Sequence, residues 1–293
     1  MSKTNKSFDN RIIITGHLGF VGSHTKKALE ERGYEVIGYD LKEGNDIRNL
    51  SQLLKVFKKG DKILHLAAIA RFAEADKDPI TAFTTNVKGT DYVAEAAHIV
   101  GVERIVYSST GSVYMPIDET PPITEDFKAR GNSIYGCSKY LGELYLKRWT
   151  TPYVILRYAH LYGEGKIGHG LVGGFLDRIQ RGLSPILYNG VQGNDFTYIK
   201  DVVQANILAL ESPLLNETYN IGTGEELSAK EAGDIICEMF GWVGEVEKKL
   251  GRSVDPLHFV YDISKAKKLL KYNPKYSFRD GLKDFYDKSN KKK

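Results

Sequence analysis

The sequence predicts an α/β fold in which a doubly wound, mostly parallel sheet is covered by helices on both faces. Two observations support this prediction. Apolar strand-like runs alternate with helical runs along about two thirds of the chain, as in sheets built from repeated strand–helix–strand units. The first strand-like run also leads through a glycine-rich loop directly into a helix, which is a common opening unit of such a sheet.

The expected strands are short runs rich in apolar residues and bounded by turn residues. In chain order they are Arg11–Thr15, Glu35–Tyr39, Lys62–Leu66, Arg104–Ser108, Tyr153–Arg157 and Thr218–Ile221. The expected helices lie between these strands, where apolar residues recur at helical spacing. They are Gly19–Arg32, Leu50–Lys58, Ile80–Val100, Ser133–Trp149 and Ile199–Leu210.

The regular alternation ends after Tyr162, where glycine-rich connections introduce other segments. We therefore expect a second, smaller lobe of mixed α/β structure. The predicted sheet domain comprises residues 1–165 and 196–224, and the predicted lobe comprises residues 166–195 and 225–293.

The composition fits a globular protein and argues against several other classes. With 293 residues, of which 42% are hydrophobic, the chain is long enough to bury a large core. A net charge of +4 is too small to predict a nucleic-acid partner, and we find no secretory signal and no apolar run of membrane-spanning length. The two cysteines form neither a disulfide framework nor a metal cluster, so we expect a cytoplasmic location, no metal site and a small buried side chain at Cys137.

The loop after the first strand has the spacing Gly-x-x-Gly-x-x-Gly, formed by Gly16, Gly19 and Gly22. The first glycine permits a tight turn, the second lets the backbone approach a pyrophosphate, and the third lets the helix pack closely on the strand. The helix residues Phe20 and Val21 lie where unpaired backbone N–H groups face such an anion. The pattern predicts a dinucleotide-binding domain of the Rossmann type.

The second strand ends at Asp40, within about 20 residues of the glycines. A carboxylate at this place can accept hydrogen bonds from the ribose hydroxyls of adenosine, and it would repel a 2'-phosphate. The expected cofactor is therefore NAD rather than NADP, although Lys42 and Arg48 are close in sequence and leave NADP open.

Tyr135 and Lys139 are four residues apart within one predicted helix, so they project from the same face. An ammonium beside a phenol favours the phenolate, and we expect Lys139 to lower the pKa of Tyr135 so that it can take a proton near neutral pH. Thr110, which follows the fourth strand, can hydrogen-bond the same substrate oxygen. The pair alone is a weak signal, because the same spacing is frequent on amphipathic helices.

Further short motifs follow one another along the chain. They are Asp46-Ile47, His65-Leu66-Ala67-Ala68, Asn86-Val87-Lys88-Gly89-Thr90, Ser108-Ser109-Thr110-Gly111-Ser112-Val113-Tyr114, Leu156-Arg157-Tyr158 and Leu161-Tyr162-Gly163. With the glycine loop, Asp40, Tyr135 and Lys139, they make the chain resemble the extended short-chain dehydrogenase/reductase family. The similarity is to its NAD-dependent nucleotide-sugar epimerase/dehydratase branch, which includes UDP-glucose 4-epimerases, and it covers nearly the whole chain.

The resemblance implies roles for individual residues. The implied catalytic residues are Thr110, Tyr135 and Lys139. The cofactor contacts, some already indicated by the glycine loop, are Gly16, Gly19, Phe20, Val21, Gly22, Asp40, Asp46, Ile47, Leu66, Ala67, Ala68, Asn86, Ser108, Tyr135, Lys139 and Tyr158. The implied substrate contacts are Thr110, Gly111, Ser112, Tyr135, His160, Asn194 and Arg252. We interpret His65 as a structural histidine without a catalytic role.

The reaction that the resemblance implies is a transient oxidation of a sugar hydroxyl, in which Tyr135 removes the proton and NAD accepts the hydride. Return of the hydride to the other face of the keto-sugar gives 4-epimerisation without net use of NAD. Where related dehydratases and decarboxylases carry acidic residues, this chain has Gly111 and Ser112, which favours epimerisation. A keto-sugar reductase or dehydrogenase that uses NAD(P)H and a non-catalytic NAD-binding regulator remain as alternatives.

Departures from the family pattern leave the exact substrate open. Asn194 stands where an arginine usually pairs with the diphosphate, Met115 replaces a glycine, and His160 replaces an asparagine. A nucleoside-diphosphate sugar is expected, with Arg252 as its remaining family arginine, and another kind of alcohol stays open. The helices Ile80–Val100 and Ser133–Trp149 carry more apolar residues than one sheet contact requires, and the resemblance implies that they pair in a homodimer.

Overall fold

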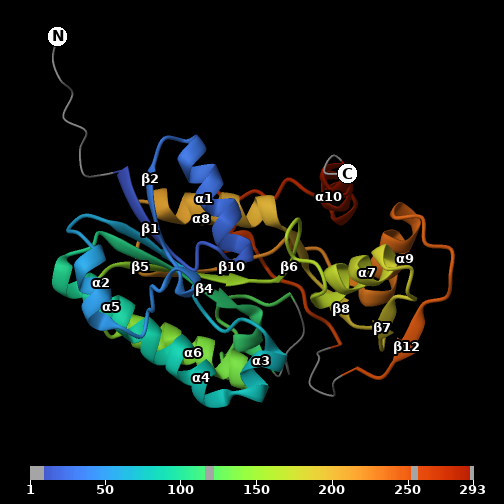
Figure 1. The fold of residues 1–293 in the computed structure, drawn as a ribbon, viewed down its shortest axis with the longest axis horizontal. Coiled ribbons are helices and arrows are strands. Elements are labelled where there is room, and N and C mark those ends of the chain that lie inside the picture. Colours follow the sequence, from blue (N-terminus) through green and yellow to red (C-terminus); the bar gives the residue numbers. More distant parts are fainter. Residues whose placement is uncertain (1–9, 116–121, 252–256, 291–293) are drawn as a thin grey trace, which may run out of the picture. The chain divides into compact units, whose positions relative to one another are not determined.

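The computed structural model describes residues 10–115, 122–251 and 257–290 (Figure 1). Its chain divides into two compact units. The first unit comprises Met1–Tyr114, Ala129–Arg157 and Ala205–Tyr219, and the second comprises Met115–Lys128, Tyr158–Gln204 and Asn220–Lys293. The chain therefore passes between the units several times.

A six-stranded sheet forms the centre of the first unit, in the order β10-β5-β4-β3-β1-β2. Its strands are β1 (Arg11–Thr15), β2 (Glu35–Tyr39), β3 (Lys62–His65), β4 (Arg104–Thr110), β5 (Tyr153–Tyr158) and β10 (Glu217–Ile221). β1 pairs in parallel with both β2 and β3, and β3 pairs in parallel with β4. Because β2 and β3 lie on opposite sides of β1, the winding direction reverses between β1 and β3. Such a switch point leaves a crevice at the carboxyl ends of the two strands, where ligands of doubly wound sheets bind.

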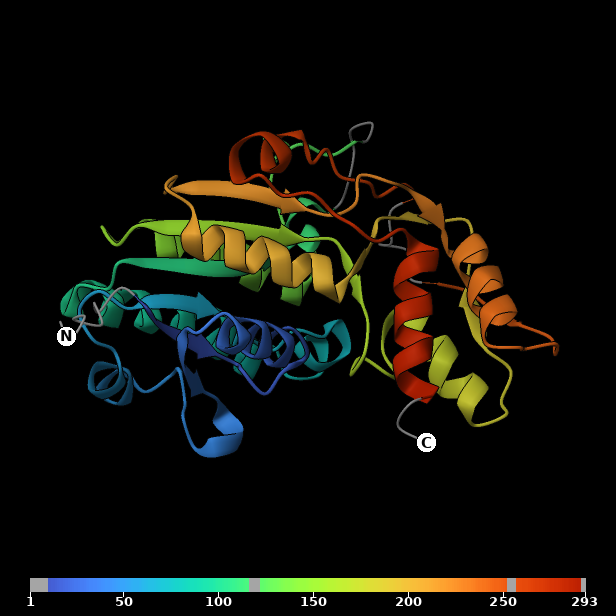
Figure 2. The same ribbon diagram turned by 90° about the horizontal axis from the view of Figure 1, so that it is seen from above.

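Helices cover both faces of this sheet (Figures 1 and 2). One face carries α1 and α8, and the other carries α2, α5 and α6. Their bounds are α1 Phe20–Glu31, α2 Leu50–Val56, α5 Thr90–Val100, α6 Ile134–Lys147 and α8 Ile199–Glu211. Fully buried strand residues such as Ile13, Ile63 and Ile105 pack against Val93 and Ala97 of α5, and these apolar contacts form much of the core. The predicted fold class is confirmed.

The segment predicted as one helix, Ile80–Val100, is helical but not uniform. It consists of α4 (Pro79–Phe83), a π-helical turn η3 (Thr84–Gly89) and α5. The wide turn places Asn86 so that its side chain exchanges two hydrogen bonds with the backbone of Ile69, at 2.7 and 2.9 Å. π turns inside helices are frequent at functional sites. The sequence period alone did not reveal this one, because a single inserted residue hardly changes the apolar pattern.

Short elements complete the first unit at the edge where its strands end. They are η2 (Leu41–Glu43), α3 (Phe72–Lys77) and η4 (Gly111–Tyr114). η2 follows β2, α3 follows β3 and η4 follows β4, so each lies after the carboxyl end of a strand. Three different loops therefore begin at the carboxyl edge of the sheet.

In the part of the second unit that the structure describes, short strand pairs are packed with helices. The pairs are β6 (His160–Tyr162) with β9 (Phe196–Tyr198), β7 (Ile186–Tyr188) with β12 (Glu247–Lys249), and β8 (Gly193–Asn194) with β11 (Leu227–Ser228). The helices are α7 (Gly170–Gln180), α9 (Ala229–Met239) and α10 (Phe278–Asn290), and a π-helical turn η5 spans Ala266–Leu270. Ser228 and Glu231 close the start of α9 with a reciprocal capping box. Within the described ranges, no helix is both long and apolar enough to cross a membrane.

Candidate active site

The glycine loop follows β1 and has the geometry that its spacing predicts. Gly16 adopts a left-handed backbone with φ of 74°, and a Cβ there would lie 2.8 Å from the Ala67 nitrogen. A Cβ on Gly22 would lie 2.3 Å from the Gly16 carbonyl oxygen. Both positions therefore exclude any other residue, the first by conformation and space and the second by space. The contact with Ala67 brings the loop after β1 against the segment after β3.

The start of α1 is suited to an anion. Gly19 is the N-cap residue and supplies no side-chain cap, and the first turn contains no acidic residue. The first N–H groups of any helix lack intrahelical partners and form its positive end. Phe20 and Val21 stand in this first turn, directly after the glycine loop.

Asp40 links the end of β2 to the glycine loop. One carboxylate oxygen accepts the Leu18 N–H at 3.1 Å, and the other accepts the Lys42 N–H at 3.0 Å. Asp46 lies a few residues on, where its carboxylate forms a bidentate pair with Arg48, at 2.7 Å for the closest contact. The hydrogen bonds from Arg48 lower the pKa of Asp46. Arg48 is thus already neutralised, which removes one of the two cations that left NADP open.

Ile47 is buried, and η3 is shaped around it. A Cβ at Gly89 would lie 2.7 Å from the end of the Ile47 side chain, so a larger residue there would require Ile47 to move. The predicted pair Asp46-Ile47 therefore has one half-buried ionic member and one packed apolar member. Both lie in the loop that follows β2.

His65 ends β3 and is a fully packed structural histidine, as predicted. Its Nδ1 lies 2.7 Å from the Thr15 hydroxyl, and its Nε2 lies 3.0 Å from the Thr90 hydroxyl. The Thr90 hydroxyl donates its hydrogen to the Asn86 carbonyl, so it accepts from the imidazole and assigns the proton to Nε2. Burial, with Lys139 nearby, lowers the pKa of His65 to about 3, and the ring stays neutral.

Asn86 is buried, and its side chain connects two parts of the site. Besides its bonds to Ile69, the amide donates to the Ser138 hydroxyl at 2.9 Å. Both amide hydrogens are therefore used within the protein. Since Ser138 precedes Lys139 on α6, Asn86 holds the loop after β3 against the helix that carries the Tyr/Lys pair.

Tyr135, Lys139 and Thr110 are brought together in the first unit. Tyr135 and Lys139 lie one turn apart on α6, and Ser133 caps that helix by accepting the Gly136 N–H at 3.0 Å. A polar contact connects Thr110, the last residue of β4, with the Tyr135 hydroxyl. The Tyr135 ring packs edge-on against Phe72 of α3, with centroids 5.3 Å apart. The Lys139 Nζ lies 4.2 Å from the Tyr107 ring centroid, where a cation is attracted to the π face.

The expected pKa relation between Tyr135 and Lys139 is wrong for this structure. Burial raises the pKa of Tyr135 to about 12, opposed only by the contact from Thr110. Burial also lowers the pKa of Lys139 to about 7, while Glu143 raises it. The sequence argument considered only the charge of the ammonium beside the phenol. In the structure Lys139 is buried and Tyr135 is partly buried, so desolvation outweighs their mutual effect.

The remaining predicted residues of the first unit lie around η4 and α6. Ser108, Gly111 and Ser112 are buried, and the Ser112 N–H donates to the Thr110 hydroxyl at 3.2 Å. A Cβ at Gly136 would lie 2.5 Å from the Ser112 carbonyl oxygen, so α6 begins in direct contact with η4. Cys137 is exposed, and the expectation that it is buried is wrong, because it faces away from this contact.

Four predicted residues belong to the second unit, and each is described there by itself. Tyr158 ends β5 and is buried, and its carbonyl accepts from the Tyr261 hydroxyl at 3.5 Å. His160 packs edge-on against Phe259, with ring centroids 5.2 Å apart. The Asn194 amide donates to the Gln192 carbonyl at 3.0 Å. Arg252 lies outside the described residues.

Sequence reasoning missed a buried ionic network under the Tyr/Lys pair. Glu143 lies on α6 one turn beyond Lys139, and Arg157 of β5 forms a bidentate pair with it at 2.9 and 2.6 Å. The Ser109 hydroxyl donates to the same carboxylate at 2.5 Å, and Arg157 also donates to the Tyr114 hydroxyl at 2.8 Å. The signal was present in the spacing, because positions 135, 139 and 143 share one helix face.

The residues of the first unit fit a bound dinucleotide. Gly16 and Gly22 leave a loop without side chains, and the uncapped end of α1 follows it. Asp40 stands at the end of β2, next to that loop. The loop and helix can hold a pyrophosphate and the carboxylate a ribose. A Tyr/Lys pair beside a Thr, at the carboxyl edge of such a sheet, belongs to the extended short-chain dehydrogenases/reductases, which are enzymes that use a nicotinamide cofactor.

Comparison with known proteins defines the family. The family model described as NAD dependent epimerase/dehydratase matches residues 12–222. A Methanocaldococcus jannaschii protein, named provisionally as a UDP-glucose 4-epimerase, is 34% identical over 301 residues that cover 93% of this chain and 96% of that protein. The chain belongs to the NAD-dependent epimerase/dehydratase family. The predicted family, enzyme class and cofactor are confirmed.

Solved structures agree with this assignment. The Thermotoga maritima UDP-glucose 4-epimerase with UDP-glucose has a TM-score of 0.89 and 30% identity, covering 96% of this chain and 99% of that chain. The Bacillus cereus UDP-glucuronic acid 4-epimerase with UDP-glucuronic acid and NAD has a TM-score of 0.84 and 30% identity, covering 97% of this chain and 100% of that chain. Both are epimerases that act at the same sugar carbon.

Proposed function

We propose that this protein is an NAD-dependent 4-epimerase of UDP-sugars. The observation that carries the proposal is the contact of Thr110, at the end of β4, with Tyr135 of α6, which also carries Lys139 one turn further on. The relatives and solved structures reported above act on UDP-glucose or UDP-glucuronic acid, and that supports a UDP-sugar here. The first unit would hold the cofactor and the second would bind the nucleotide sugar.

Each polar group of the proposed site has a part in moving one proton. When bound, NAD accepts a hydride from the sugar carbon and returns it. Tyr135 takes the proton from the 4-hydroxyl and gives it back after the sugar has turned, so no acid or base is consumed overall. Thr110 hydrogen-bonds the reacting oxygen and orients it toward Tyr135. A charged Lys139 would stabilise the phenolate, against the burial that raises the pKa of Tyr135 to about 12, and would donate hydrogen bonds to the nicotinamide ribose.

The cofactor residues follow the same assignment. We assign the pyrophosphate to Gly16, Gly19, Phe20, Val21 and Gly22, and the adenosine to Asp40, Asp46 and Ile47. Leu66, Ala67, Ala68, Asn86, Ser108 and Tyr158 would border the rest of the dinucleotide, with Asn86 acting through the loop after β3. Substrate contacts are assigned to Gly111, Ser112, His160, Asn194 and Arg252.

The residues after Thr110 favour epimerisation over elimination. Gly111 and Ser112 are buried and not acidic, so neither can protonate a leaving hydroxyl at neutral pH. A keto-sugar reductase remains the second candidate, because it needs the same Tyr and Lys. The two differ in their use of cofactor. An epimerase regenerates NAD in each turnover, whereas a reductase releases one oxidised cofactor for each product.

Cofactor retention tests this choice. We expect NAD to remain bound through purification and to be released on denaturation in a near one-to-one ratio with protein, which can be measured by absorbance and mass spectrometry. Turnover should then proceed without added cofactor. Protein that arrives without NAD and works only with stoichiometric NAD(P)H would be a reductase.

Replacing Asp40 tests the adenosine assignment. We expect Asp40→Ser to weaken NAD binding about tenfold, since hydrogen bonds to a charged group are worth about 1.5–3 kcal/mol. The same change should narrow the preference for NAD over NADP, because the repulsion of the 2'-phosphate is removed. Calorimetric titration with both cofactors measures this. An unchanged ratio of the two dissociation constants would contradict the role of Asp40.

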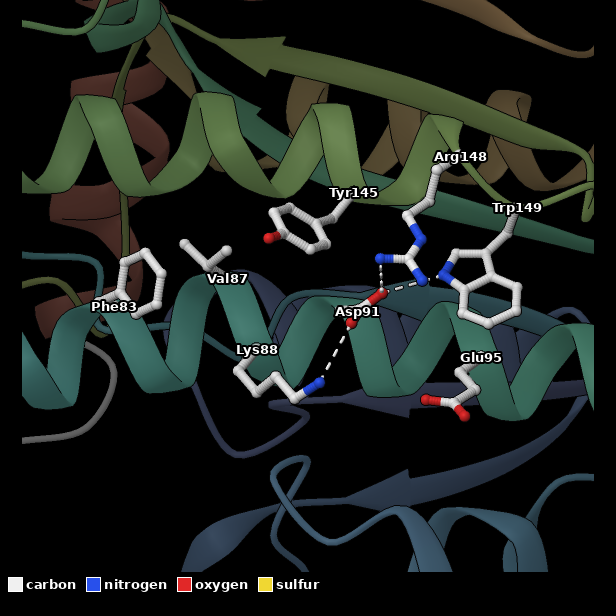
Figure 3. Close-up of a pocket in the computed structure, with 8 residues that line it drawn as sticks. All are labelled: Phe83, Val87, Lys88, Asp91, Glu95, Tyr145, Arg148 and Trp149. Atoms are coloured by element: carbon white, nitrogen blue, oxygen red, sulfur yellow. Dashed lines mark hydrogen bonds and ion pairs between the residues drawn. The ribbon is translucent and has the colours of Figure 1, made fainter.

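We also propose that two copies pair through the helical segment from α4 to α5 and through α6. Ile80 is 77% exposed, Phe83 is 49% exposed and Leu144 is 44% exposed, so this side of the unit presents large apolar side chains to its surroundings. A surface pocket of about 270 Å³ lies between the two helices (Figure 3). Its lining residues are Phe83, Val87, Lys88, Asp91, Glu95, Tyr145, Arg148 and Trp149.

Inside the pocket, the buried Asp91 is already paired. It accepts the Trp149 indole N–H at 3.0 Å and contacts Lys88 at 3.3 Å. The charge of Asp91 is therefore compensated within one copy, and a partner would meet the aromatic Phe83 and Tyr145 beside the charged Glu95. A twofold pairing would cover them.

The dimer prediction is checked with a charged substitution. We expect Phe83→Glu to convert the protein from dimer to monomer in sedimentation velocity at micromolar concentration, because it would bury a carboxylate in the contact. Leu183→Glu, at a residue of the second unit that is 39% exposed, is the matched control and should stay dimeric. A wild-type monomer would contradict the proposal.

The free cysteines Cys137 and Cys237 support our further proposal of a reducing, cytoplasmic location.

A further inference from the structure

Glu143 is fully buried directly behind the proposed catalytic pair. It follows Tyr135 and Lys139 at successive intervals of four residues on α6, so all three lie along one face of the helix. Lys139 is 2% exposed and Glu143 is 0% exposed. The charge of a buried carboxylate must be balanced by hydrogen bonds or by a cation. Because Glu143 follows the proposed catalytic pair on the same helix face, its partners can affect that pair.

The carboxylate of Glu143 connects three elements that carry site residues. Arg157 binds it bidentately from β5 at 2.9 and 2.6 Å, and Ser109 donates to it from β4 at 2.5 Å. Ser109 is the neighbour of Thr110, and Arg157 also holds Tyr114 of η4 at 2.8 Å. The end of β4 and the turn η4 are thereby fixed relative to the helix of Tyr135.

The charges around Lys139 give Glu143 a second effect. The groups around the ammonium are the neutral His65 from β3, the Tyr107 ring from β4 and Glu143 on α6. Glu143 is itself paired with the positive Arg157 of β5. Among these described groups, Glu143 alone carries a negative charge. Its field raises the pKa of Lys139 against burial, which lowers it to about 7. The protonation of Lys139 near neutral pH therefore depends on this carboxylate.

We propose that Glu143 is a positioning residue of the active site: its carboxylate keeps Lys139 charged and, through Ser109, holds Thr110 in register with Tyr135. The proposal rests on the proposed function only for the roles of Thr110, Tyr135 and Lys139. Glu143 itself does not touch the reacting atoms. It acts through Lys139 and Thr110. Its effect is therefore measurable in the titration of Lys139 as well as in turnover.

The test compares the titration of Lys139 in the full chain, with NAD as purified, between wild type and Glu143→Gln. Lysine labelled with carbon-13 reports the ionisation of Lys139 by NMR, and the signal is assigned by its loss in Lys139→Met. We expect the glutamine variant to lose the lysine proton about one pH unit lower than wild type. The alkaline limb of the kcat profile should move down by the same amount, because the neutral amine no longer stabilises the phenolate.

Two further variants separate this effect from loss of stability. Glu143→Gln leaves Arg157 buried and unpaired, and that positive charge also disfavours a charged Lys139. The double variant Glu143→Gln/Arg157→Met removes both charges, so we expect its Lys139 to titrate between the single variant and wild type. Asp61→Asn breaks another buried pair, in which Arg11 contacts Asp61 at 2.6 Å at the opposite end of β1. It should lower the melting temperature without moving the titration of Lys139.

The role of Ser109 has its own check. Ser109→Ala keeps every buried charge, so we expect kcat to fall about tenfold with little change in KM or in the titration of Lys139.

An unchanged Lys139 titration in a folded glutamine variant would overturn the proposal, as would the failure of both glutamine variants to fold, which would assign Glu143 to structure alone. The NMR titration needs no turnover. Wild-type protein that converts no UDP-sugar would therefore refute the proposed function while leaving the role of Glu143 measurable.

Discussion

Replacing Tyr135 by Phe is expected to lower kcat about a thousandfold, which is within the range that a positioned acid/base contributes. The variant keeps the ring that packs against Phe72 and loses only the hydroxyl in contact with Thr110. Binding of NAD should change little, since the pyrophosphate and adenosine contacts are elsewhere. Steady-state kinetics with UDP-glucose and calorimetry with NAD measure the two quantities separately.

The same substitution at Tyr153 is the matched control. Tyr153 begins β5, at the end of the sheet opposite to the site, and it is partly buried like Tyr135. Tyr153→Phe should leave kcat near the wild-type value. A Tyr135→Phe enzyme with nearly full turnover would show that another group moves the proton, and the account of the site would then be wrong.

A second large effect is expected at Gly22. A Cβ added at this glycine would lie 2.3 Å from the Gly16 carbonyl oxygen and 2.7 Å from the His17 Cα. Both neighbours are backbone atoms of the loop, so neither can turn aside. We expect Gly22→Val to cost about 3 kcal/mol of stability. The displaced loop should also weaken NAD binding. A loss of about 3 kcal/mol in the free energy of binding corresponds to about a hundredfold higher dissociation constant.

Gly174 provides the contrasting glycine. It lies within α7, and an added Cβ would meet nothing within 4 Å. Gly174→Ala should therefore raise the free energy of unfolding by about 1 kcal/mol, because alanine favours a helix more than glycine does. Urea denaturation compares the two variants. If the two substitutions changed the free energy of unfolding equally, the close packing around Gly22 would not be the reason that a side chain is excluded there.

The parts of the site that depend on local backbone were predictable from sequence. Gly16, Gly22 and Asp40 act within a strand, a loop and a helix start, and spacing alone describes such a unit. All six predicted strands occur in the central sheet with small shifts at their ends, because each is a short apolar run with few alternatives. The order of the strands places their loops at one edge, as the doubly wound pattern requires.

The parts that depend on tertiary contact were not predictable. The environment of Tyr135 is decided by burial among several segments, and this reverses the expected direction of its pKa shift. The hydrogen bonds of Asn86 and the π turn η3 exist because two loops meet there. The spacing of Glu143 from Tyr135 and Lys139 on α6 is visible in the sequence. Ser109 and Arg157 lie on two strands, β4 and β5, and only the fold shows that both contact Glu143.

The most direct test of the central claim is the stereochemistry of the product at C4. The purified protein is incubated with UDP-glucose, UDP-galactose, UDP-glucuronic acid and UDP-N-acetylglucosamine, without added cofactor, and the products are resolved by NMR. The account predicts that at least one of these sugars is converted to a mixture with its 4-epimer, with no change in mass. The same mixture should form whichever of the two epimers is supplied. Loss of water or carbon dioxide, or turnover only with added reduced cofactor, would contradict it.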